Sequence, residues 1–112
     1  METRQTNKLF GTRRRTQVLL LIHLLAETHA SELATLLGTP LKTVQRILNA
    51  LEDEMLIVGR TVGRERRIRL NDRYFACTEL KALLSALARR DRETESVAES
   101  LRRRPRRQGK EI

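Results

Sequence analysis

The sequence predicts a mostly α-helical domain that carries one small β-hairpin. Apolar residues recur at helical spacing in three segments before residue 55 and in a fourth segment after residue 77. Between them, residues 56–70 contain a short apolar run and an alternating run on either side of Gly63. Gly38, Thr39 and Pro40 lie together between the second and third segments, which is typical of one helix ending and another beginning.

The first helix is expected from Arg13 to Ala26. Val18, Leu21, Ile22 and Leu25 follow the i, i+3, i+4, i+7 spacing that predicts one buried face. Leu20 and Leu24 form a second apolar face. A helix that is apolar on two sides lies centrally in a core or also takes part in an interface.

The second helix is expected from Ala30 to Leu37, with Gly38 in the position that closes a helix. The third is expected to run to Glu54, with Thr39 as its N-cap and Pro40 in its first position. Its inward-facing residues are predicted to be Leu41, Val44, Ile47, Leu48 and Leu51.

The hairpin is expected to begin at Leu56–Val58 and to return through Ile68 and Leu70, with Gly63 in the turn. A last helix starts near Thr78. These elements form a domain over residues 13–90. Residues 1–12 are interpreted as a flexible basic arm, and residues 91–112 as a helix extension followed by a disordered basic tail.

Charge and composition narrow the class of function. The chain has 112 residues, a formal net charge of +9 and a pI of about 11.1, which favours a polyanionic partner. Aromatic residues are scarce, which argues against single-strand binding by base stacking. The lone Cys77 fits a reducing cytoplasm, and no apolar run is long enough to span a membrane. No catalytic motif, metal-ligand cluster or cofactor motif is present, so we expect no enzyme activity, metal or cofactor.

The ordered pattern resembles the winged helix-turn-helix transcription regulators over about residues 16–87. Residues 31–38 are similar to the first helix of that motif, residues 39–48 to its turn and recognition helix, and residues 63–70 to its wing. The resemblance is nearer to the ArsR-like group than to the MarR-like group. It implies a homodimer that places two recognition helices in successive major grooves of double-stranded DNA. The leucines expected at the dimer interface are Leu20, Leu24, Leu83 and Leu87.

Two positions depart from the family pattern. Relatives usually carry glycine where Met55 stands, and methionine tolerates positive φ poorly. We therefore expect the backbone at the end of the third helix to differ from that of the family. Metal-sensing ArsR proteins have paired cysteines or histidine and acidic clusters. Cys77 is alone, and metal sensing is therefore not expected.

The predicted DNA contacts lie on the third helix and the wing. Gln45 and Asn49 can pair with adenine, and Arg46 with guanine or a phosphate, whereas the alternative is a plain solvated helix face. Arginines in the wing are suited to phosphates or a minor groove. Two further hypotheses are a protein-interaction module, such as the regulator half of a toxin–antitoxin pair, and structured-RNA binding. The predicted contact residues are Thr39, Lys42, Thr43, Gln45, Arg46, Asn49, Arg64, Arg66 and Arg67.

Overall fold

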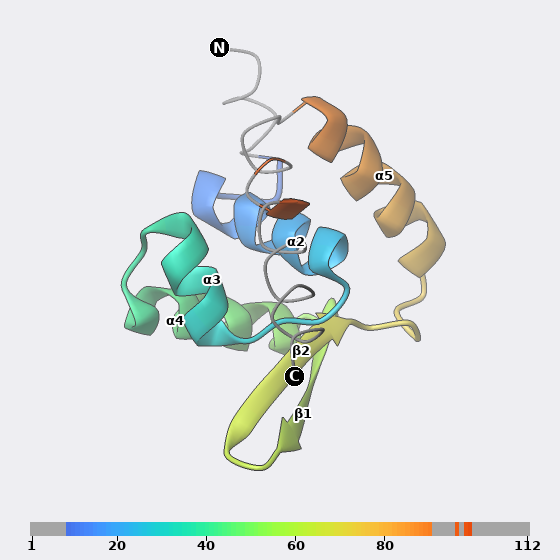
Figure 1. The fold of residues 1–112 in the computed structure, drawn as a ribbon. Coiled ribbons are helices and arrows are strands. Elements are labelled where there is room, and N and C mark those ends of the chain that lie inside the picture. The colour runs from blue at the N-terminus through green and yellow to red at the C-terminus, as the bar shows by residue number, and fades with distance from the viewer. Residues whose placement is uncertain (1–8, 91–95, 97, 100–112) are drawn as a thin grey trace, which may run out of the picture.

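The computed structural model describes residues 9–90, 96, 98 and 99, and within them it is mostly helical with one antiparallel hairpin, as predicted (Figure 1). Most of the predicted arm and tail lies outside these residues. Residues 9–12 belong to the folded domain, since Phe10 packs against the core and the Thr12 side chain caps the first described helix. The elements are α2 (Arg13–Leu25), α3 (Ala30–Leu37), α4 (Leu41–Asp53), β1 (Ile57–Val62), β2 (Glu65–Leu70) and α5 (Cys77–Arg90).

Helix α2 is the centre of the core. All five residues from Val18 to Ile22 are fully buried, and α5, α4 and β2 each contact this helix. Figure 1 shows α5 on one side of α2 and the α3–α4 pair on the other. The two apolar faces predicted for the helix are therefore both used inside one chain. Leu20 is a core residue, and the prediction that it forms a dimer surface is wrong for the folded chain.

The hairpin projects from the helices and is fixed at its base by a third segment. Ile57 pairs with Leu70 and Val62 with Glu65, which leaves Gly63 and Arg64 as a two-residue turn. Gly63 has a φ of 65°, as the sequence predicted for a turn glycine. Thr28, in the loop before α3, exchanges two backbone hydrogen bonds with Ile68 of β2, at 3.0 and 2.7 Å. The base of the hairpin is thus hydrogen-bonded on both sides of β2.

The beginning of α4 differs from the prediction. The helix starts at Leu41 with Pro40 as the cap residue, and no side chain caps it. Thr39 is largely buried, and its hydroxyl donates a hydrogen bond of 3.3 Å to the carbonyl of Leu37 instead. Backbone amides of Gly38 and Thr39 bond to the end of α3, so Thr39 closes α3 rather than opening α4. Leu41 was predicted to face inward but is 43% exposed.

The end of α4 keeps the backbone conformation that glycine favours, although the residue is methionine. The amide of Leu56 donates to the carbonyl of Leu51, and that of Met55 to Glu52, which together form the two bonds of a Schellman motif. Met55 has a φ of 69°, and Asn71 donates a 2.9 Å bond to its carbonyl. The expectation of a different helix exit is therefore wrong, because these three bonds hold Met55 in the left-handed conformation.

We predict that Met55→Gly stabilises the domain by about 1 kcal/mol, since glycine removes the cost of a side chain in the left-handed region. Little burial is lost, because Met55 is 62% exposed. Urea denaturation followed by circular dichroism measures the change in free energy of unfolding. The control is Glu54→Gly, at a φ of −87°, which is expected to destabilise the domain. Equal or lower stability of Met55→Gly would contradict the prediction.

Candidate nucleic-acid interface

One face of α4 is exposed and carries no acidic residue before Glu52. Lys42, Gln45, Arg46 and Asn49 are all exposed, as their helical spacing predicted, and Thr43 is half-buried beside them. The opposite face is anchored in the core by Val44, Leu48 and Leu51, which are fully buried. This division fixes the rotation of the helix, so its polar side chains point away from the domain.

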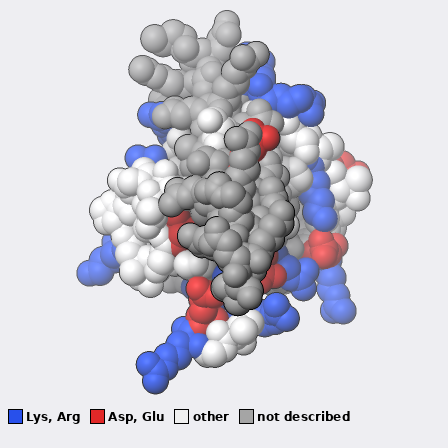
Figure 2. Space-filling model, viewed as in Figure 1, with Lys and Arg blue, Asp and Glu red and all other residues white. Residues whose placement is uncertain are grey.

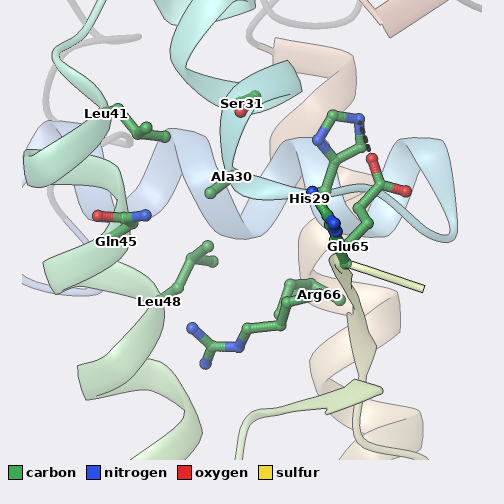
Figure 3. A pocket seen from close by; sticks show the side chains of 10 residues that line it. His29, Ala30, Ser31, Leu41, Gln45, Leu48, Glu65 and Arg66 are labelled. Atoms are coloured by element: carbon green, nitrogen blue, oxygen red, sulfur yellow. Dashed lines mark ion pairs between the residues drawn. The ribbon is translucent and has the colours of Figure 1, made fainter. Parts of the chain in front are cut away.

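An open groove of 630 Å³ separates α4 from β2. Its apolar lining comes from Ala30, Leu41, Leu48 and Ile68, and its polar lining comes from α4, the hairpin and the start of α3 with the residue before it. Figure 3 shows Gln45 on the α4 side of this groove, and Arg66 extending across it from β2 toward α4. The exposed face of α4 and the hairpin therefore lie side by side. Residues of the polar lining are His29, Ser31, Gln45, Arg64, Glu65 and Arg66.

Arg66 ties the hairpin to α4. Its Nη1 donates a 3.2 Å hydrogen bond to Oδ1 of Asn49, and its Nη2 donates to and forms an ion pair with Glu52. Both partners belong to α4 and lie within one helical turn of each other. Arg66, which was predicted as a DNA contact, therefore positions the hairpin against α4.

Gly59, which was not among the residues predicted to be functional, permits this connection. A Cβ atom at Gly59 would lie 3.2 Å from Nε of Arg66 and 3.3 Å from Cδ1 of Ile68. Glycine on β1 thus leaves the space in which the Arg66 side chain crosses the strand toward α4. The available signal was a glycine within a strand of mostly β-branched residues, which often marks a close approach of other atoms to the backbone.

Arg67 lies in an ion-pair network that faces the loop before α3. Its Nε bonds to Glu27 at 2.9 Å and its Nη1 to Glu65 at 3.0 Å, while Arg60 lies 3.8 Å from Glu27. The hydrogen bond from Arg67 lowers the pKa of Glu27, and the same bond raises the pKa of Arg67. His29 Nε2 extends the network to Glu65 at 3.3 Å (Figure 3). Arg67 is half-buried here, so the structure does not present it as a free DNA contact.

Acidic residues therefore accompany most of the hairpin arginines. Figure 2 shows Asp and Glu beside Lys and Arg around the projecting hairpin. Arg69 pairs with Asp72 at 3.2 Å, in addition to the pairs of Arg60, Arg66 and Arg67. Arg64, at the turn, is exposed and has no acidic partner among the residues that the structure describes. On the exposed face of α4 and in the hairpin, the basic residues without an acidic partner in the described structure are Lys42, Arg46 and Arg64.

No protein-family model, curated protein or solved structure matches this chain. The candidate interface joins an exposed, carboxylate-free helix face to a hairpin whose position is fixed by ion pairs on both of its faces. Two predicted contact residues are not supported by this geometry: the Thr39 side chain is largely buried, and Arg67 is half-buried in ion pairs with Glu27 and Glu65.

The predicted dimer residues are not brought together on one surface. Leu20 is fully buried, Leu87 is nearly so, and Leu24 is half-buried, whereas Leu83 on α5 is 39% exposed. Helix α5 is linked to α2 by a 2.8 Å hydrogen bond between His23 and Ser85. Partial burial, together with the nearby charge of Lys81, lowers the pKa of His23. His23 is thus a structural residue of the α2–α5 contact. No helix in the described part of the chain is long and apolar enough to cross a membrane.

Proposed function

We propose that this chain is a winged helix-turn-helix protein that binds double-stranded DNA and regulates transcription. The observation that carries the proposal is the placement of the carboxylate-free face of α4 beside an anchored hairpin that ends in Arg64. A major groove is about 12 Å wide and admits one α-helix, whose exposed side chains then meet the base edges. The net charge of +9 supports a polyanionic partner.

The residues divide into two roles. Lys42, Arg46 and Arg64 are charged, exposed and without acidic partners in the described structure, which suits them to phosphates. Gln45 and Asn49 present carboxamides from the centre of the same helix face, which suits them to base edges. Thr43 is half-buried and lies at the edge of that face. The hairpin would follow the phosphate backbone of the DNA, next to the major groove that α4 occupies.

A second copy of the chain completes the proposal. Half-sites one helical turn apart require two α4 helices related by two-fold symmetry. We place the association on the exposed side of α5 around Leu83, because at 39% exposure it is the most accessible of the four leucines predicted at the dimer interface.

The decisive experiment is a salt titration of binding to a mixed-sequence DNA duplex, followed by fluorescence anisotropy. Each phosphate contact contributes about −0.9 to the slope of log affinity against log salt. We expect Arg64→Ala to weaken binding and to flatten the slope by about one unit, with sequence preference retained. The matched control is Arg89→Ala, which removes an exposed arginine from α5.

The same titration tests the alternatives. Double-stranded RNA of the same sequence is the competitor, and stronger competition by RNA than by DNA would redirect the proposal to structured RNA. Absence of duplex binding at low salt would contradict the proposed function. Equal slopes for the parent and Arg64→Ala would show that the hairpin tip does not contact the backbone.

A further inference from the structure

The contact between Arg66 and Asn49 restricts what Asn49 can offer to a base. A guanidinium group has only N–H donors and no acceptor. Asn49 must therefore turn its Oδ1 toward Arg66, as the 3.2 Å bond records. Its Nδ2 then points away from Arg66, and no hydrogen bond engages it within the described part of the chain. The side chain presents two amide hydrogens outward.

Glu52 holds the guanidinium in this position. It pairs with Nη2 of Arg66 while Nη1 bonds to Asn49, so the two α4 residues grip opposite arms of the same group. Two of the five guanidinium N–H bonds are used in this way, which leaves three to donate elsewhere. Arg66 and Asn49 are therefore joined by a hydrogen bond, and the polar groups that they leave unengaged are all N–H donors. These donors lie at the boundary between the exposed face of α4 and the groove.

From this arrangement we infer that Asn49 and Arg66 together select guanine at one base pair of the DNA site, with Glu52 as the positioning residue. Guanine shows two acceptors in the major groove, O6 and N7, which match a pair of donors. Adenine shows N7 and a donating N6 amino group, and that amino group would meet a cation beside Oδ1. The adenine pairing expected for Asn49 from sequence alone is thereby disfavoured. The inference rests on the proposed function and specifies one part of it.

The test is selection of bound duplexes from a random DNA pool, carried out with the full chain and four variants. Asn49→Ala identifies the relevant base pair as the one where preference disappears. The parent chain is expected to select guanine there, by roughly 5- to 150-fold over adenine. Arg66→Ala frees Oδ1 and is expected to change the preference at that base pair to adenine. Arg66→Lys keeps a donor beside Oδ1 and is expected to retain guanine.

The matched control is Arg69→Ala, which removes an arginine of the same strand that pairs with Asp72 instead of with α4. It is expected to leave the preference at this base pair unchanged. Preferences at all other base pairs report that each variant is folded and bound. Adenine selected by the parent chain, or guanine retained by Arg66→Ala, would overturn the inference while leaving the proposed function intact. Failure to enrich any duplex would overturn both.

Discussion

Reversing the charge of Arg46 and Arg64 together is expected to abolish detectable duplex binding at moderate salt. Arg46 is exposed on α4 and Arg64 is exposed at the hairpin turn, and neither has an acidic partner among the described residues. A hydrogen bond to a charged group contributes roughly 1.5–3 kcal/mol, so the loss of two such bonds lowers affinity on the order of 10²- to 10⁴-fold. Two added carboxylates also repel the phosphates. Anisotropy titration of the Arg46→Glu/Arg64→Glu variant measures the effect.

The control for this prediction must carry the same change in net charge. Arg73→Glu/Arg89→Glu provides it, because both arginines are exposed and lie after the hairpin, on the α5 side of the chain. General electrostatic attraction falls equally in both double variants, whereas direct contacts are lost only in the first. Similar loss of affinity in the two variants would mean that α4 and the hairpin tip are not the binding surface.

Replacing Leu20 with glutamate is expected to unfold the chain, whereas the same change at Leu83 leaves it folded. Leu20 is fully buried at the centre of the α2 core. Truncation of such a leucine to alanine costs about 2–5 kcal/mol, and an unpaired buried carboxylate costs more. A domain of this size has only about 5–15 kcal/mol of stability to lose. Loss of cooperative thermal unfolding, followed by circular dichroism, is the expected result for Leu20→Glu.

Leu83→Glu is the matched variant and tests the proposed dimer. Its side chain is 39% exposed, so the carboxylate remains hydrated in a single chain and the unfolding transition is retained. In a pair of chains joined around Leu83, the new charge would be buried and association would weaken. Sedimentation equilibrium measures this change. An unaltered oligomeric state would place the contact elsewhere, and a folded Leu20→Glu chain would contradict the core assignment.

Much of the helical architecture follows from local sequence signals. Apolar spacing located α2, α3, α4 and α5 to within one or two residues at most ends, because a 3.6-residue period is written into each segment. Gly38 and Gly63 marked a helix end and a turn, since both positions need a positive φ that other residues resist. The exposed α4 face followed from the same periodicity, because burying Val44, Leu48 and Leu51 forces the intervening polar residues outward.

The state of each arginine could not be predicted in this way. The sequence shows six arginines between residues 60 and 73, which suggested a basic ribbon suited to a phosphate backbone or a minor groove. Arg67 instead pairs with Glu27, 40 residues earlier, and Arg66 with Glu52, 14 residues earlier. Such partners are distant along the chain and meet only after α4 and the hairpin have packed. Arg64, at the turn, lacks an acidic partner in the described structure, because the neighbouring Glu65 pairs with His29 and Arg67 instead.

Local sequence signals were sufficient to predict the helices, the hairpin and the polar face of α4, because each depends on residues that are neighbours along the chain. That Leu20 is buried in the core and Leu83 is exposed depends on packing, although both fit an apolar helical stripe equally well. The left-handed backbone at Met55 likewise depends on tertiary contacts, because hydrogen bonds from Leu56 and Asn71 hold the residues around it. Periodicity shows that a helix face is apolar or charged, but only packing determines which groups from elsewhere in the chain cover or neutralise that face.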